Sequence, residues 1–458
     1  RTGAAHHMSR FASILLLQLA AGFLYLAASS NALLREMRRQ AGISQADPLI
    51  NAPPLVTFTT IALGGFRGIL ADVLWLRAAR LQEEGQYFEL VQLADWITKL
   101  EPRFTSVWSY HAWNLAYNIS VLFAASEDRW RWVSSGVRLL RDEGLAYNPG
   151  EPRLLYELGW LFQHKIGANL DQAHLYYKQA WAAEMAQLFD GPRPDYGALM
   201  MAATNSPDAG RYRRLKEDYK LDPALMREVE AQYGPLDWRL PQAHAIYWAW
   251  RSRLIATDFD ALSADRMIFQ NLSDAFRQGS LFTGPDGKEF IPSPNPDLLP
   301  RVRDAYEDAI RRNPGQDTVK TAYRNFLGEA VVMLLSYNRN EEARELFDEL
   351  AKTYPGEDTA QGFGPFVMNT YAASLKDLTD RNAQAVVEGS LYQAMLWQAL
   401  GDPARAAGYD RLARLAWDTY MAPRKDSAEW AERTGLPPLA ELRAIARQRV
   451  SETVGGLR

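Results

Sequence analysis

Hydrophobic and polar positions divide the 458-residue chain into one long uncharged run and a series of shorter helical patterns. The uncharged run covers residues 11–34, with Arg10 before it and Arg35, Arg38 and Arg39 after it. At ~1.5 Å per residue, a helix over this run would exceed the ~30 Å hydrocarbon core of a bilayer. The pattern predicts a transmembrane anchor, with a cleaved signal peptide or a buried core helix as alternatives.

The flanks of the run give conflicting indications of orientation. Residues 1–10 form a short tail in which "RTGAAHH" is typical of a tag, and Met8 would then be the native start. The basic residues after the run would hold the following chain in the cytoplasm, whereas the short tail with Arg10 favours export. We expect a single-pass protein of the inner (cytoplasmic) membrane with most of the chain in the periplasm. A chain facing the cytoplasm is the alternative.

Helical periodicity resumes after a proline-rich linker over residues 35–54. It recurs in hairpin-sized units: a glycine ends the first helix, small residues repeat along the second, and a proline closes the unit. The first unit has Gly85, Ala94 and Pro102 at these places. Later units show the same spacing through Leu155, Gly159, Phe162, Ala173, Tyr177, Ala343, Phe347, Pro355, Gly401, Ala406 and Ala413.

These spacings resemble the tetratricopeptide repeat (TPR), a helical hairpin of about 34 residues. The resemblance covers residues 71–185 and 320–425, and residues 64–102 with "AWNLAYN" are similar to membrane-anchored bacterial proteins of this type. It implies an all-α, TPR-like helical-hairpin solenoid behind the N-terminal transmembrane or signal-anchor helix. The expected parts after the linker are an N-terminal solenoid (55–185), an insert (186–300), a C-terminal solenoid (301–425) and a capping helix (426–458).

The insert over residues 186–300 interrupts the repeat pattern with loops and helices. Its glycine, proline and aspartate content predicts irregular loops, whereas residues 242–255 predict an aromatic helix. Pro285 to Gly287 predict the turn of a short hairpin. Because long loops often carry function, the insert is one expected place for a site.

Composition narrows the chemistry. The net charge of −4 comes from 51 basic and 55 acidic residues, so no basic domain indicates nucleic-acid binding. The absence of cysteine excludes disulfides, thiolate metal sites and cysteine nucleophiles. The six histidines form no HExxH motif, and no nucleophile elbow, phosphate loop or dinucleotide fingerprint occurs. We therefore predict no catalytic residue, no cofactor and no metal, and expect the protein not to be an enzyme.

Candidate contact residues follow from the TPR resemblance, since that family lines its groove with the first helix of each hairpin. "AWNLAYN" places Asn114, Tyr117 and Asn118 on one helix face, where they could bind a peptide backbone or instead satisfy one another. Arg67, at the junction of anchor and solenoid, is the candidate for a membrane-edge contact. The implied groove residues are Trp75, Arg77, Trp108, His111, Asn114, Tyr117 and Asn118.

The sequence therefore favours a membrane-anchored scaffold or assembly factor that binds other membrane or envelope proteins through a concave surface. Residues 11–34 would contact membrane lipid. One alternative is a structural subunit of a larger membrane complex. The other is an enzyme, acting for example on cell-wall glycan, with its site in residues 186–300.

Overall fold

The computed structural model describes residues 66–189, 191–201, 207–283, 290–375, 380–421 and 436–455, together with isolated positions between 18 and 37. Within these residues the fold is almost wholly helical, which confirms the predicted all-α class. The chain divides into unit 1, which ends at Phe104, and unit 2, which begins at Thr105. The predicted tail, the predicted linker except Met37, and most of the predicted anchor lie outside the described residues.

Among the described residues, none of the helices is both long enough and apolar enough to cross a membrane. This finding corrects the prediction of a single-pass location in the inner membrane. The long helices have the length but carry charges: the 18-residue α3 (Phe66–Glu83) includes Asp72, Arg77 and Arg80, and the 21-residue α14 (Asp258–Gln278) begins and ends with charged turns.

Unit 1 contains one helical hairpin among its described residues, formed by α3 and α4 (Tyr87–Leu100). Gly85 makes the turn with φ +71°, a left-handed conformation that glycine adopts without strain. This is the place where the sequence predicts that the first helix of the hairpin ends. Burial is concentrated on α4 and the second half of α3. In the first half of α3, Phe66 and Val73 are 74% and 57% exposed. The side chain of Arg67 lies outside the described part of the chain.

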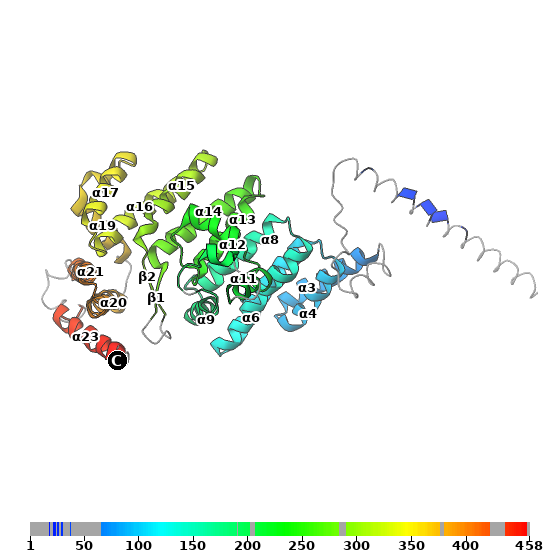
Figure 1. Ribbon diagram of the computed structural model, residues 1–458, viewed down its shortest axis with the longest axis horizontal. Helices are drawn as coiled ribbons and strands as arrows, with labels where there is room; N and C mark the ends of the chain where they lie inside the picture. The colour runs from blue at the N-terminus through cyan, green and yellow to red at the C-terminus, as the bar shows by residue number, and fades with distance from the viewer. Residues whose placement is uncertain are drawn as a thin grey trace, which may run out of the picture. The chain divides into compact units, whose positions relative to one another are not determined.

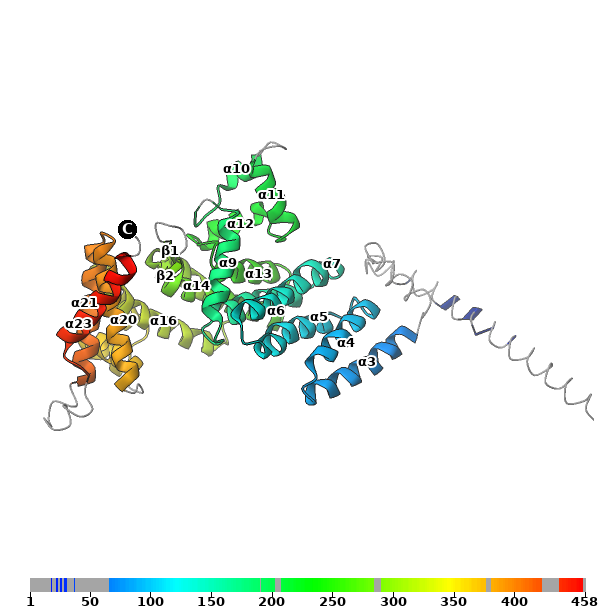
Figure 2. The ribbon, with the colours of Figure 1, turned by 90° about the horizontal axis from the view of Figure 1, so that it is seen from below.

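Unit 2 is a succession of helices (Figures 1 and 2). Its first half contains α5 (Thr105–Trp113), η1 (Asn114–Ile119), η2 (Ser120–Leu122), α6 (Ser126–Arg138), η3 (Leu139–Gly144), α7 (Leu145–Tyr147), α8 (Pro152–Trp160), η4 (Leu161–Gly167) and α9 (His174–Ala186). The region predicted as an insert contains α10 (Tyr196–Met201), α11 (Pro207–Glu217), α12 (Pro223–Tyr233), α13 (Pro241–Arg253), α14, β1 (Ser280–Thr283) and β2 (Phe290–Ser293). The remainder contains η5 (Pro296–Leu298), α15 (Leu299–Arg312), α16 (Asp317–Ser336), α17 (Asn340–Thr353), α18 (Glu357–Ala360), α19 (Phe363–Leu375), α20 (Asp380–Ala399), α21 (Pro403–Met421) and α23 (Leu439–Gly455).

The aromatic helix α13 lies at the centre of unit 2. Eleven of its thirteen residues are buried, including Tyr247 and Trp248, and it packs against α8, η4 and α14. Only Arg251 and Arg253 of this helix are partly exposed, which is typical of a helix in the core. Figure 2 shows α10 and α11 extending outward from the helices around α13. The predicted insert is therefore part of the core rather than an attachment to it.

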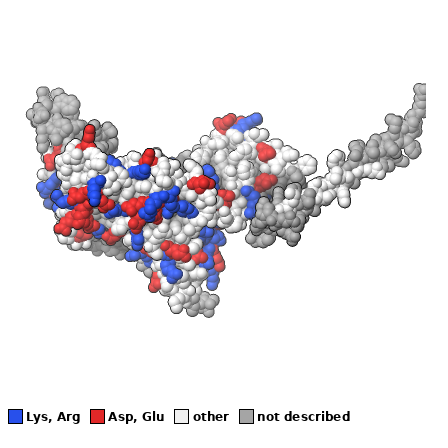
Figure 3. Space-filling model, turned by 90° about the horizontal axis from the view of Figure 1, so that it is seen from above, with Lys and Arg blue, Asp and Glu red and all other residues white. Residues whose placement is uncertain are grey.

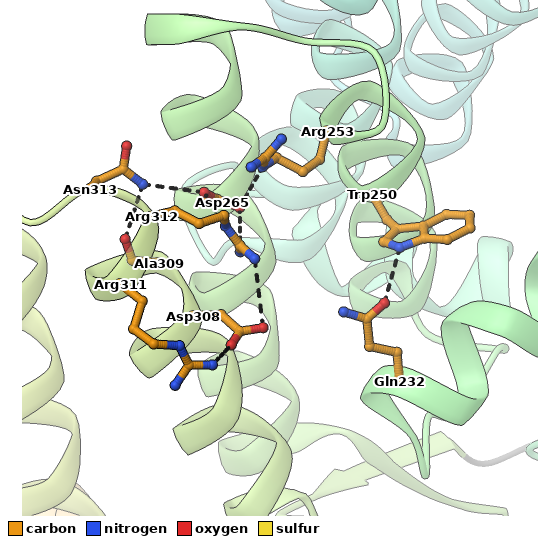
Figure 4. A network of polar contacts seen from close by, with 9 residues as sticks. All are labelled: Gln232, Trp250, Arg253, Asp265, Asp308, Ala309, Arg311, Arg312 and Asn313. Carbon is orange, nitrogen blue, oxygen red and sulfur yellow. Dashed lines mark hydrogen bonds and ion pairs between the residues drawn. The ribbon is translucent and has the colours of Figure 1, made fainter.

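A buried ion cluster joins α13, α14 and α15 (Figure 4). The side chain of Asp265 is 2% exposed and accepts hydrogen bonds from Arg253 Nε at 3.0 Å and Arg312 Nη2 at 2.8 Å. Asn313 Nδ2 lies 3.4 Å from the same carboxylate. Since an unpaired charge at this depth would be costly, the two arginines fix the relative positions of three helices.

The expected hairpin in the insert is confirmed, because β1 and β2 pair antiparallel from Ser280–Ser293 to Thr283–Phe290. The last described helix, α23, forms with α20 and α21 a second apolar cluster around Leu391 and Leu442. Gly401 turns the chain between α20 and α21 with φ +85°, at the turn that the sequence predicts.

Candidate functional site

The predicted groove residues are divided between the two units. Trp75 and Arg77 lie in unit 1, where the Trp75 ring packs 6.2 Å from the Phe104 ring and Arg77 forms a 3.1 Å ion pair with Glu89. The other predicted groove residues lie in unit 2. The surface described below is built from unit 2 alone.

Trp108 and His111 are core residues. Trp108 is 1% exposed and its ring stacks 5.7 Å from the ring of Tyr147, while His111 is 4% exposed. Both lie on the face of α5 that packs against neighbouring helices of the unit. Because a solvent-facing groove requires accessible side chains, these two residues have no part in the site below.

The next three predicted residues lie on η1, where the helix widens to π-helical hydrogen bonding. The Ser120 N–H donates to Leu115 O, five residues back instead of four. Asn114 is fully buried, and its Oδ1 accepts a 2.9 Å hydrogen bond from Asn118 Nδ2. The two amides therefore bind each other, which is the alternative that the sequence left open. Tyr117 is half-buried and points to a different set of partners.

Tyr117 belongs to a row of five stacked rings, here called the aromatic row, that crosses two helices. The successive ring pairs are Trp113–Tyr117 at 5.4 Å, Tyr117–His164 at 5.7 Å, His164–Trp160 at 4.7 Å and Trp160–Tyr156 at 6.4 Å. Within each helix the rings are four residues apart, so they lie on one face. Across the helices, Tyr117 Oη and His164 Nδ1 are 3.0 Å apart. Trp113 at one end is 40% exposed, and the other rings are half-buried.

A buried charge cluster supports the aromatic row from beneath. Lys165 is 4% exposed, and its Nζ lies 2.6 Å from Asp171 Oδ2 and 5.1 Å from the centre of the Tyr117 ring. Asp171 also accepts hydrogen bonds from Arg129 Nη1 at 3.2 Å and from Ala173 N at 2.8 Å. Burial alone would raise the pKa of Asp171, but the hydrogen bonds and the two cations lower it overall. The carboxylate is therefore ionised at neutral pH, and the cation against the Tyr117 ring is held in place.

The rings of the row are uncharged at neutral pH. Burial and the positive charge of Lys165 lower the pKa of His164, so its imidazole is neutral. Burial raises the pKa of Tyr117 and Tyr156 above the ordinary value for a phenol. The row is therefore a partly exposed, uncharged aromatic surface, and the neighbouring Gln163 side chain is hydrogen-bonded to Gln270.

The members from α8 and η4 were not among the residues predicted from the sequence. Tyr156, Trp160 and His164 follow one another at intervals of four residues, and that spacing was an available signal of an aromatic helix face. The described residues contain no cluster of three or more His, Asp or Glu that could hold a metal ion. On the face shown in Figure 3, basic and acidic side chains are intermingled.

No protein-family model matches this sequence, and the search of curated proteins returned no significant match. The resemblance to tetratricopeptide repeats therefore stays a prediction.

Proposed function

We propose that this protein is a helical scaffold that holds a protein partner on the aromatic row, within a TPR-like stack of helical hairpins. The observation that carries this proposal is the row itself: five neighbouring rings, of which three pairs are stacked and Tyr117–His164 is tilted, lie together with Trp113 exposed and the other four partly exposed. Aromatic side chains are enriched in protein interfaces because they give a large contact area at a small cost in conformational entropy.

The surroundings of the row favour a protein segment with apolar side chains as the partner. The rings carry no net charge that a partner must balance, and the Lys165–Asp171 ion pair next to them is already satisfied. A rigid support reduces the entropy lost on binding, because the side chains are ordered before the partner arrives. Stacked helical hairpins commonly bind extended peptides or helices in this way.

The proposal can be tested by photo-crosslinking in cells that express the full chain. A photoreactive amino acid replaces Trp113, the exposed end of the row. The matched control has the same amino acid in place of Phe259, which is 69% exposed on α14. We expect a discrete protein adduct from position 113 and none of the same mass from position 259. No adduct from position 113, or the same adduct from both positions, would refute the proposal.

A second pair of variants separates contact from folding. Trp160→Ser removes one ring from the row, whereas Trp160→Phe keeps a ring at the same place. We expect the adduct from position 113 to fall at least fivefold with Trp160→Ser and to persist with Trp160→Phe. Circular dichroism establishes that both variants retain the helical fold before the yields are compared.

A further inference from the structure

A second surface in unit 2 has a different chemistry from the aromatic row. It is a cleft of about 430 Å³, here called the cationic cleft, between η3, α7, the start of α12 and α13. Its volume lies within the range of small-molecule sites, which is about 300–1,000 Å³. Four cations line it, Arg141, Lys216, Lys220 and Arg251, against the two carboxylates of Asp142 and Asp222.

The two carboxylates are already used by two of the cations. Arg141 Nε and Nη2 donate to Asp142 at 2.7 and 2.9 Å, and Lys216 Nζ lies 3.2 Å from Asp222 Oδ2. Among the described residues, Lys220 and Arg251 have no ion-pair partner. The cleft therefore retains two positive charges that an anion would balance.

Arg251 is held in position without being neutralised. Its guanidinium lies 5.0 Å from the centre of the Trp248 ring and 5.8 Å from that of Tyr247. Tyr247 is itself fixed, since its Oη accepts a 3.1 Å hydrogen bond from the backbone N–H of Asp222. Aromatic faces restrict an arginine but leave its N–H donors available for a ligand.

Lys220 occupies a backbone position that disfavours lysine. It follows α11 with φ +54°, and the Leu221 N–H donates a 2.8 Å hydrogen bond to the Leu215 carbonyl, six residues back, which closes the end of the helix. Glycine is the preferred residue there because a side chain strains a positive φ. A strained lysine without a partner, at the mouth of a cleft, is an outlier that a ligand-binding role would explain.

The rest of the cleft is apolar. Leu145, Ala146, Pro149 and Leu225 line it beside the charged residues. We propose that the cationic cleft binds a small organic anion, a carboxylate or phosphate ester, whose charged end meets Lys220 and Arg251 and whose apolar body lies against these side chains. This proposal is independent of the aromatic row, and neither depends on the other.

The test uses the full chain and two fluorescent probes that differ in one charged group. The anionic probe is 8-anilinonaphthalene-1-sulfonate, and N-phenyl-1-naphthylamine is its neutral counterpart. We expect the anionic probe to bind at one site and the neutral probe to bind at least tenfold more weakly. Competition with decanoate and with decyl phosphate then distinguishes a carboxylate ligand from a phosphate ligand.

Variants locate the binding. Arg251→Gln and Lys220→Gly each remove one unpaired charge. Each is expected to lower the affinity for the anionic probe about tenfold, the usual loss for a hydrogen bond to a charged group. Lys320→Gln makes the same charge change on the exposed surface of α16, where Lys320 pairs with Asp317, and is expected to leave affinity unchanged. Arg251→Lys keeps the charge and is expected to restore part of the affinity.

Lys220→Gly gives a result that misfolding cannot imitate. It relieves the strain at φ +54°, so the variant is expected to have a higher thermal midpoint together with weaker binding. Equal affinity for both probes, or a loss below threefold in both Lys220→Gly and Arg251→Gln, would overturn the proposal.

Discussion

Gly408 allows α21 and α16 to approach at backbone distance, and its replacement by alanine is expected to force them apart. A methyl group at this position would lie 1.7 Å from the carbonyl oxygen of Ser336 and 2.4 Å from its carbonyl carbon, whereas ordinary contact begins at 3.4 Å. Both of these atoms belong to the backbone, so no side chain can rotate away. The helices would have to separate or tilt along their whole contact.

Two opposing effects set the size of the loss. Adding a methyl group to a well-packed contact costs about 1–3 kcal/mol of stability. The cost here lies at the upper end of that range because the added methyl group overlaps a rigid backbone. Alanine is better than glycine inside a helix by about 1 kcal/mol. The net expectation for Gly408→Ala is a loss of about 2 kcal/mol. Gly389→Ala is the matched control, because Gly389 lies inside α20 with nothing within 4 Å of its added methyl group.

Hydrogen exchange read by mass spectrometry is the suitable assay, because a single unfolding free energy is not well defined for a large chain with more than one unit. A loss of 2 kcal/mol corresponds to about thirtyfold faster exchange of the amides in α16 and α21. Gly389→Ala is expected to slow exchange or leave it unchanged. If the amides of α16 and α21 exchange as slowly in Gly408→Ala as in Gly389→Ala, the backbones of these two helices do not approach each other as closely as described.

Two further predictions concern buried charge. Asp265→Asn leaves Arg253 and Arg312 without their carboxylate and is expected to cost about 3 kcal/mol in the opening free energy of α13, α14 and α15 measured by hydrogen exchange. Asp317→Asn, at a side chain that is 87% exposed, should change that free energy by less than about 0.5 kcal/mol, and equal changes in the two variants would contradict the ion cluster. Burial lowers the pKa of His244 from 6.5 to about 4, so the unfolded chain binds the proton first and stability falls as the pH drops from 6.5 toward 4. His244→Phe should remove about 2 kcal/mol of the difference in opening free energy that hydrogen exchange of α13 measures between pH 6.5 and 4.5, and an unchanged difference would show that His244 does not cause it.

The sequence predicts helical hairpins well where one residue determines the geometry. Gly85 and Gly401 both turn with positive φ, which a hairpin of this length requires and which glycine alone adopts without strain. The burial of Trp108 was not predictable in the same way. Periodicity indicates which residues share a helix face, but it does not say which face meets a neighbour.

The site was harder to predict because its residues come together across the chain. Tyr117 and His164 are 47 positions apart, and the packing of η1 with η4 brings their rings into contact. A second cause is local. No pattern in the sequence indicated that the helix would widen at η1, and a spacing rule based on 3.6 residues per turn fails where hydrogen bonds reach back five residues.

That widening links the two surfaces. The segments η1, η3 and η4 are all π-helical, and they supply Tyr117, His164 and Lys165 to the aromatic row and its support, and Arg141 to the cationic cleft. Each widened turn inserts one residue and rotates the following side chains by about 100° relative to a regular helix. A side chain that regular periodicity would place in the core is thereby turned toward another face, at the cost of weaker local hydrogen bonding. Both candidate sites thus contain side chains that π-helical turns displace from their regular positions. Regular periodicity therefore predicts the helices more readily than it predicts these two surfaces.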